Sequence, residues 1–547
     1  MSRASTSRYL IFITIAAAFG GLLFGYDTAV ISGAVQPIRS YFVEPLFQNT
    51  ELARHVVGEF KTSLLLGATL IFCLSLYYLI RLYGRTRGLM VGGLVAFFGS
   101  WLMHDQVMSL PDQITPNLAS SLTGFTISSA LLGCVIGGFC AGSVSERLGR
   151  RNGLMLSAAL FIIASIGSAL PEYFNPLPLQ DITVFNLYRI IGGIGVGIAS
   201  MLSPMYLAEI APSHIRGRLV SCNQFCIILG MLVVYFINYF IAHGEPQEWL
   251  VQQGWRWMLG SEVLPALVFL LLLIRTPETP RYLVMRGKHE QASRVLEAIN
   301  GKDKAPAILQ EIRASFAESA ADAPWMSFGG LLIAISLLLS IFQQFIGINV
   351  VLYYAPEIFK NMGSQGDASL QLTIIVGAVN LIFTIAAIVL VDRVGRKPLM
   401  IIGALVMGIS MLGLGTSFYL QNLGVTAMLL MLSYVAAFAV SWGPVVWVLL
   451  SEIFPNSIRG ALSIAVAVQW LANLLVSWSF PIMNDNAWLN EMFNHGFVYW
   501  VYGVMGLLAA GFVWRWVPET KNKTLEEMST TWKTRTVTAA KLSAEPV

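Results

Sequence analysis

Apolar runs alternate with short polar or charged segments along the whole chain, and this pattern predicts a bundle of membrane-spanning helices. One bilayer crossing takes about 20 mainly apolar residues in a helix. On this measure we predict fourteen spans, at residues 9–31, 62–83, 88–104, 124–144, 154–171, 184–206, 219–241, 256–275, 329–354, 370–391, 398–419, 426–450, 461–482 and 496–517. The polar interval at residues 276–325 has a helix-forming composition and is predicted to be a water-facing linker between two halves.

The composition favours the same class. Hydrophobic residues make up 56% of the chain and charged residues 12%, and the charged share is about half that of a typical soluble protein. The mean hydropathy is +0.68. We therefore predict an all-α polytopic membrane protein. The five cysteines lie within apolar runs without the spacing typical of metal ligands or disulfides, so we expect neither a metal nor another cofactor.

The basic residues indicate how the chain is oriented in the membrane. If every predicted span is real, the lysines and arginines near 3–8, 81–87, 147–151, 216–218, 276–325, 393–397 and 459 and in the C-terminal tail all lie on one side. That side is expected to be the cytoplasm. Asp27 interrupts the first apolar run and no small-residue cleavage site follows cleanly, so we expect this run to be retained as a helix. We predict a multi-pass protein of the cell inner membrane with both termini cytoplasmic.

Three motifs of the first half recur in the second half, in the same order and at a nearly constant offset. The recurring pairs are Glu146–Arg151 with Asp392–Lys397, Leu207–Gly217 with Leu450–Gly460, and Pro277–Thr279 with Pro518–Thr520. Single motifs match by chance, but three motifs in register indicate an internal repeat. Two related halves with a site between them are typical of transporters.

An amide-rich segment, residues 342–354, lies inside the apolar run 328–354. It contains Gln343, Gln344 and Asn349, and a buried amide without a partner costs roughly 2–7 kcal/mol. These side chains therefore face protein or a water-filled cavity rather than lipid. Either most of the helix circumference lines a cavity, or the helix unwinds at Gly347. Amides that donate and accept hydrogen bonds suit a neutral polyhydroxyl ligand. Equally, they would serve as polar contacts between helices.

The chain resembles the sugar porter family of the major facilitator superfamily, and within it the bacterial D-xylose/proton symporters, over nearly its whole length except about residues 45–120. The resemblance is carried by residues 20–27, 189–193, 277–281, 343–354, 443–447 and 518–521, together with Pro204, Tyr206, Glu209, Arg216 and Gly217. It implies a major facilitator fold of two six-helix bundles with alternating access to a midplane sugar site. The implied division is an N-terminal bundle at 1–275, a cytoplasmic linker at 276–325, a C-terminal bundle at 326–517 and a cytoplasmic tail at 518–547.

The same resemblance implies the residues that contact the sugar. The substrate-binding residues would be Gln224, Gln343, Gln344, Asn349, Trp447 and Gln469, with Phe24, Tyr353, Asn380 and Trp470 as secondary contacts. A tryptophan among amides suits a sugar, because the apolar C–H face lies on the ring while hydroxyls meet donors and acceptors. Core packing or an interfacial position is the commoner role of a tryptophan considered alone.

Two features depart from the family pattern. Close xylose symporters carry a second glutamine where this chain has Met231, and the change removes a hydrogen-bonding group from the expected site. The usual basic residue after Arg459-Gly460 is missing, so the interval from Arg459 to Gln469 is one residue shorter. The first departure makes xylose itself a less secure substrate, and the second is expected to alter the cytoplasmic latch locally.

The stretch 45–120 is foreign to the family and contains two apolar runs, so it can enter and leave the membrane without inverting the helices that follow. We predict that it adds a two-helix hairpin to the twelve core helices. Residues 83–90 also echo residues 148–155. We interpret the hairpin as a local copy of the one formed by the second and third core helices, and a coincidence of arginine-rich turns is the alternative. We expect the hairpin to pack peripherally and leave the pore unchanged.

Asp27 and Arg189 are the candidates for proton coupling. Each charge alone would be costly near the bilayer centre, and pairing is the usual resolution. Burial and a neighbouring guanidinium act on the proton affinity of a carboxyl group in opposite directions, so relative movement of the pair can load and unload a proton. The resemblance gives Asp27 the proton and Arg189 the role of its partner. Glu262 is a second candidate acid, or equally a gate contact.

Charged residues at the helix ends of the repeated motifs are the candidates for a cytoplasmic gate. They are Glu146, Arg147, Arg150, Glu209, Arg216, Asp392, Arg393, Arg396, Glu452 and Arg459. A single charged cluster is usually a solvated loop that sets orientation. Clusters related by a repeat, together with the resemblance, favour ion pairs that close the inner face and break when it opens.

The predicted function is proton-coupled import of a monosaccharide, D-xylose or a related pentose or hexose. The alternatives are a passive sugar uniporter, against which Asp27 argues because facilitative relatives lack an acid there, and a sensor that has lost transport. We do not expect an enzyme, because no nucleophile–base pair, metal cluster or phosphate loop occurs in the sequence. The expected partners are the sugar, the proton and the lipid bilayer, with no nucleic acid, and the protein is expected to be a monomer.

Overall fold

The computed structural model describes residues 3–175, 177–212, 215–318, 325–364, 366–454 and 461–521. Within these ranges the regular elements are all helices, and 14 of them are long and apolar enough to cross a membrane. The predicted class and number of spans are therefore confirmed. Side chains within the described helices are not all placed, and those of Arg216 and Asp392 lie outside the described part.

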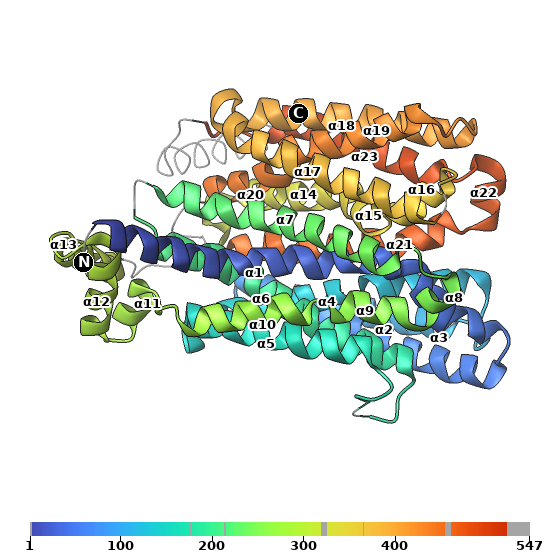
Figure 1. Ribbon diagram of the computed structural model, residues 1–547, viewed down its shortest axis with the longest axis horizontal. Coiled ribbons are helices and arrows are strands. Elements are labelled where there is room, and N and C mark those ends of the chain that lie inside the picture. Colours follow the sequence, from blue (N-terminus) through green and yellow to red (C-terminus); the bar gives the residue numbers. More distant parts are fainter. Residues whose placement is uncertain are drawn as a thin grey trace.

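The helices of the first half run side by side along the long axis of the molecule (Figure 1). The core helices are α1 (Arg3–Ile38), α4 (Pro116–Leu148), α5 (Arg150–Ala169), α6 (Asp181–Ile210) and α7 (Arg216–Ala242). The last span of the first half is divided into α8 (Gln247–Trp249), a π-helical turn (Leu250–Gly254), α9 (Trp255–Gly260) and α10 (Val263–Ile274).

The second half lies beside the first and occupies the upper part of Figure 1. Its helices are α14 (Gly330–Phe345), α15 (Ile348–Tyr353), α16 (Ala355–Asn361), α17 (Asp367–Val394), α18 (Arg396–Tyr419), α19 (Val425–Val440), α20 (Trp442–Ile453), α21 (Leu462–Asn484), α22 (Ala487–Phe493) and α23 (Phe497–Trp516). Helices α4 and α21 pack together, as do α7 and α17. These two contacts form most of the seam between the halves, and α1 also contacts α15 and α16 across it.

Between the halves, the short helices α11 (Pro280–Met285), α12 (His289–Asn300) and α13 (Ala305–Glu318) gather beyond one end of the bundle, on the left of Figure 1. They share a small core of Leu283, Val284 and Ala292. We call this the linker end of the bundle, and the opposite end the far end.

The inserted stretch forms α2 (Thr50–Tyr83) and α3 (Arg85–Met108), which pack against each other. Helix α2 also packs along α4, where the rings of Phe60 and Phe125 lie 5.4 Å apart. At the linker end Tyr78 donates a hydrogen bond to the carbonyl of Ser463 in the second half, at 3.4 Å. The hairpin is therefore attached to the outside of the first half and reaches the second half at its tip.

Three one-residue turns join consecutive helices in the same backbone conformation. Gly84, Gly149 and Gly395 lie between α2 and α3, α4 and α5, and α17 and α18, with φ of 81°, 95° and 102°. Positive φ favours glycine because it lacks a Cβ. A Cβ at Gly149 or Gly395 would meet the carboxylate of Glu278 or Glu519, whereas nothing lies within 4 Å at Gly84. The hairpin thus shares the turn of the core pairs without its acidic neighbour, and its origin as a copy stays a prediction.

The amide-rich span is broken rather than continuous. Helix α14 ends at Phe345 and α15 begins at Ile348, with Gly347 between them in the left-handed region at φ 90°. The ring of Tyr502 would lie 2.5 Å from a Cβ at Gly347, so a larger residue is excluded twice over. Of the two geometries predicted for this segment, unwinding at the glycine is the one that forms.

Candidate functional site

A cavity of about 460 Å³ lies between the two halves. Helices α1, α6 and α7 line it from the first half, and α14, α15, α17, α18, α19, α20 and α21 line it from the second. All ten residues predicted to contact a sugar line this cavity: Gln224, Gln343, Gln344, Asn349, Trp447, Gln469, Phe24, Tyr353, Asn380 and Trp470. No residue of the α2–α3 hairpin is among those lining it.

The amides of the second half form one connected chain of hydrogen bonds. Asn349 donates to Gln344, Gln344 donates to Gln343 at 3.4 Å, and Gln469 donates to the same Gln343 oxygen. Gln343 in turn donates to the carbonyl of Trp442 at 2.9 Å, which ties the chain to the break between α19 and α20. The amide network therefore holds its members in fixed positions along one cavity wall.

Two polar atoms of this wall have no hydrogen-bond partner among the residues that the structure describes. They are the Gln469 side-chain oxygen and the indole Nε1 of Trp470, both buried. A buried polar group without a partner costs free energy that a ligand hydroxyl would recover. The Trp470 ring also packs against Phe24 of the first half, with centroids 5.6 Å apart. This corner of the cavity therefore offers one acceptor, one donor and an aromatic surface to a small ligand.

The two tryptophans of α20 have different roles, and the sequence left that of Trp447 open between packing and sugar contact. Trp442 is fully buried and its Nε1 donates to the carbonyl of Met400, so it is a packing residue. Trp447 lies one and a half helical turns further along α20, is only partly buried and lines the cavity. Trp447 is therefore positioned to contact a ligand, and core packing does not explain it.

Sequence reasoning missed Asn473, which also lines the cavity. Its side chain bonds to the hydroxyls of Tyr353 and Ser477, at 3.5 and 3.1 Å. Asn473 lies one turn beyond Gln469 on α21, so the helical spacing of the two residues was a usable signal. Met231 lines the opposite wall, among apolar side chains of α7 such as Ile227 and Ile228. The wall from the first half is mixed, because α7 also brings the amides Asn223 and Gln224 to the cavity.

Asp27 and Arg189 form an ion pair in the core of the first half, at 2.7 Å between Arg189 Nη1 and Asp27 Oδ1. Asp27 is fully buried and Arg189 is 2% exposed. The other carboxylate oxygen and the Arg189 Nε have no hydrogen-bond partner. Arg189 Nη2 also donates to the backbone carbonyl of Asp27 at 3.3 Å, so the carboxylate itself is held by one short contact, and displacement of α1 against α6 would separate the charges.

Glu262 is buried beside this pair. Ser165 donates a 2.8 Å hydrogen bond to one of its oxygens, and Asp27 and Arg189 are its charged neighbours. Two carboxyl groups and one guanidinium therefore lie close together in a region closed to solvent. The sequence left Glu262 open as an acid or a gate contact, and its position beside Asp27, away from either end of the bundle, favours the acid.

At the linker end the internal repeat produces two matching ion pairs. Arg150 and Glu209 lie 2.8 Å apart in the first half, and Arg396 and Glu452 lie 2.8 Å apart in the second. Thr279 and Thr520 donate to the same two glutamates at 2.6 Å. Each pair lies within one half, so neither pair by itself joins the halves.

Two further acidic residues, absent from the predicted gate, complete these clusters. Glu278 accepts hydrogen bonds from the backbone N–H groups of Arg150 and Arg151, at the start of α5. Glu519 does the same for Arg396 and Lys397 at the start of α18. A carboxylate at a helix N-terminus is favourable because it caps free N–H groups. The recurring Pro-Glu-Thr motif was the available signal for both.

The other predicted gate residues take part mainly through their backbones. The carbonyls of Glu146 and Arg147 accept hydrogen bonds from Arg286, and that of Arg393 accepts one from Lys521. Arg459 lies outside the described residues, as do the side chains of Arg216 and Asp392.

Polar contacts between the halves gather at the far end. Arg39 of the first half binds Asp485 of the second at 2.6 Å, and Ser120 donates to the same carboxylate at 3.2 Å. We call these three residues the far-end latch. The central cavity extends the other way, toward Arg396 and Ser451 at the linker end. The structure is therefore closed at the far end, with its cavity directed to the linker end.

Comparison with known proteins identifies the family. Residues 13–532 match the family described as Sugar (and other) transporter. The D-xylose-proton symporter of Escherichia coli (strain K12) is 49% identical over 98% of each protein. The glucose facilitated diffusion protein of Zymomonas mobilis is 37% identical over 98% of this chain and 100% of that protein.

A solved structure gives the same result. The inward open conformation of the xylose transporter XylE from E. coli matches with a TM-score of 0.75 and 48% identity, covering 96% of this chain and 100% of that one. The relatives are transporters rather than enzymes, as predicted. The chain therefore belongs to the sugar porter family of the major facilitator superfamily.

Proposed function

We propose that this protein imports a monosaccharide together with a proton by alternating access, with D-xylose or a related pentose or hexose as the sugar. One observation carries the proposal: the buried Asp27–Arg189 pair stands beside a cavity with an amide chain and Trp447. The amide wall and aromatic surfaces suit a sugar, and a buried carboxylate paired with an arginine in a membrane protein suits a proton. The likeness to the E. coli symporter supports both parts.

We assign the linker end to the cytoplasm and the far end to the outside of a bacterial inner membrane. The arginine-rich turns of α4–α5 and α17–α18 lie at the linker end, and positive residues favour the cytoplasmic side. Both termini are then cytoplasmic, and the structure is the inward-facing state. We propose that the protein acts as a monomer in the lipid bilayer.

The cycle follows from the two sites. With the far end open, Asp27 takes up a proton and its hold on Arg189 weakens, while the sugar binds the amide wall of the second half. The halves then rock until the far-end latch forms and the cavity opens to the cytoplasm. Arg189 again attracts the charged form of Asp27 and favours proton release inward. Each ligand shifts the equilibrium only by its preference for one state.

The test is uptake of labelled D-xylose into proteoliposomes with and without an inward proton gradient. The wild type should accumulate sugar against its gradient only when the outside is acidic. Asp27→Asn should keep sugar exchange and lose accumulation. Asp112→Asn, the same chemical change at a carboxylate that is 78% exposed in the loop before α4, should behave as wild type.

The alternatives predict other results. A passive uniporter, as the Z. mobilis relative's name describes, would equilibrate sugar without accumulating it at any pH. A sensor would bind sugar and transport none. Accumulation by Asp27→Asn equal to that of the wild type would disprove the coupling role. Competition by glucose, galactose and arabinose in the same vesicles would rank the sugars.

A further inference from the structure

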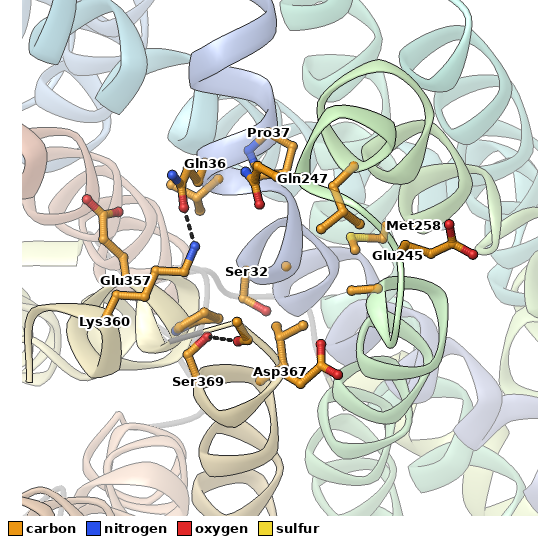
Figure 2. A pocket seen from close by; sticks show the side chains of 17 residues that line it. Ser32, Gln36, Pro37, Glu245, Gln247, Met258, Glu357, Lys360, Asp367 and Ser369 are labelled. Carbon is orange, nitrogen blue, oxygen red and sulfur yellow. Dashed lines mark hydrogen bonds between the residues drawn. The ribbon is translucent and has the colours of Figure 1, made fainter. Parts of the chain in front are cut away.

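A second pocket, of about 120 Å³, lies on the seam at the far end and shares no lining residue with the central cavity (Figure 2). Helices α1, α16 and α17 and the segment after α7 line it. Ser32 is 3% exposed, and its hydroxyl points into the pocket without a hydrogen-bond partner. A polar pocket with an unpartnered buried hydroxyl is suited to hold water.

Glu357, in the first turn of α16, is a partly buried carboxyl group on the wall of this pocket. One turn further along the same helix, Lys360 crosses the seam and donates to Gln36 of α1. Glu357 also faces the far-end latch, since Asp485 and Arg39 are among its charged neighbours. A group that faces both halves is sensitive to whether the seam is open or closed.

Other titratable groups surround Glu357. Besides Asp485, Arg39 and Lys360, these are Tyr354 on the preceding turn, Tyr499 of α23, and Glu245 and Asp367 across the pocket, with His243 paired to Asp367. Of the groups that act on it directly, one is acidic and two are basic. Closing the seam gathers them around a carboxyl group that water would otherwise solvate.

We propose that Glu357 is a second proton-binding site, which takes a proton from the outside when the far-end seam closes and returns it when the seam reopens. The proposal rests on the proposed function only in assigning the far end to the outside. Because this proton enters and leaves on the same side, it adds nothing to the number of protons imported. It makes closure of the outer gate depend on external pH.

The electrostatics support this assignment. In the closed seam, burial and then the charge of Asp485 raise the pKa of Glu357 from 4.5 to about 7, although Arg39 and Lys360 act in the opposite direction. When the seam opens, water reaches the carboxyl group and its pKa falls back toward the ordinary value. The closed state therefore binds more protons between these values, so acid favours closure and alkali favours opening. The ratio of closed to open molecules is expected to rise on the order of tens-fold from pH 8 to pH 5.

The experiment measures the seam directly in the full-length protein in detergent. Spin labels at Glu248 and Ala487, exposed far-end residues of the first and second halves, report the distance across it between pH 5 and pH 8. The native cysteines are replaced, and Asp27→Asn and His243→Gln are present throughout to remove two other groups that exchange protons. In this background the closed fraction should rise as the pH falls, with Glu357→Gln abolishing the change and Glu245→Gln leaving it intact.

A second variant keeps the test decisive if Glu357→Gln does not fold. Lys360→Gln removes the positive charge of the exposed Lys360, which lowers the pKa of Glu357. The midpoint of the pH-dependent closure should therefore move to higher pH. A pH response that survives Glu357→Gln, that is absent from the background protein, or that does not move in Lys360→Gln would overturn the proposal. Since coupling at Asp27 is already removed, accumulation by Asp27→Asn would refute the proposed function without changing this readout.

Discussion

Arg39 at the end of α1 and Asp485 at the end of α21 form a 2.6 Å ion pair that joins the two halves at the far end. The residues come from opposite ends of the sequence, and Ser120 of α4 binds the same carboxylate. At the linker end, by contrast, Arg150 and Arg396 each find a glutamate within their own half. These ion pairs therefore differ in kind: the far-end pair joins the halves, and each linker-end pair stabilises one half.

Asp485→Asn is expected to shift the protein toward the state with the far end open. The pair is partly exposed, with 34% of the Arg39 side chain and 17% of the Asp485 side chain accessible. We therefore expect the closed state to lose about 1 kcal/mol relative to the open state, or roughly a five-fold change in the ratio of closed to open molecules. Distance measurements between labels at Glu248 and Ala487 would report it. Asp112→Asn removes the exposed Lys61–Asp112 pair of the hairpin and should change nothing. An unchanged distance distribution in Asp485→Asn would show that the latch does not hold the seam.

Gln343→Ala is expected to weaken sugar binding by roughly 10- to 100-fold, equivalent to about 1.5–3 kcal/mol. Gln343 is the centre of the amide chain, because it accepts from Gln344 and Gln469 and donates to Trp442. Its loss removes one ligand contact and leaves three neighbours without their partner. Calorimetry with D-xylose measures the affinity, and Gln106→Ala on the exposed face of α3 is the matched control. Affinity equal to that of the wild type would remove the amide chain from the site.

Much of the architecture was predictable because membrane helices are apolar over a full crossing. The helix ends were not predictable, because a helix can continue into polar residues beyond its apolar part. The first span was predicted to end at residue 31, but α1 continues to Ile38. The second was predicted to begin at residue 62, but α2 begins at Thr50, with Asn49 accepting a capping hydrogen bond from Leu52. Polar residues at these ends keep their backbone hydrogen bonds within the helix, and hydropathy does not record that.

Much of the lining of the central cavity was predictable because Phe24, the amide-rich segment and Trp447 lie in motifs that carry the family resemblance. The far-end latch was not, because Arg39 and Asp485 lie outside those motifs and pair only through the packing of α1 against the second half. The surroundings of Glu357 were also not predictable from the sequence. It directly follows the amide-rich segment, but its proximity to Asp485 depends on the break after Tyr353 that starts α16 in a new direction. A one-dimensional pattern does not contain such contacts.

Glu519→Gln should destabilise the protein by about 1 kcal/mol, and Glu278→Gln should destabilise it by less. Burial raises the pKa of Glu278 above its ordinary value, whereas at Glu519 the backbone N–H groups outweigh burial and lower the pKa, so folding favours the charged form more at Glu519. Each glutamate caps the N-terminus of the helix after a glycine turn, α5 in one half and α18 in the other. Glutamine keeps the shape but loses the charge that favours this position. Thermal unfolding of each purified variant measures the effect. A larger loss in Glu278→Gln than in Glu519→Gln would contradict this order of the two caps.

Shortening the inserted hairpin is expected to leave sugar binding within about two- to three-fold of the wild type, since no hairpin residue lines the cavity. The side chains of Lys61 and Asp112 meet, with 2.8 Å between Nζ and Oδ1. The backbones at these positions are therefore close enough for a short glycine–serine linker to replace residues 63–109. This boundary keeps Ser120, which a deletion of the whole stretch 45–120 would remove from the far-end latch. Because Tyr78 touches the second half at the linker end, the transport rate is a separate readout from affinity. A shortened protein that folds but binds no D-xylose would show that the hairpin shapes the pore, and Tyr78→Phe distinguishes loss of the single hydrogen bond from loss of the hairpin.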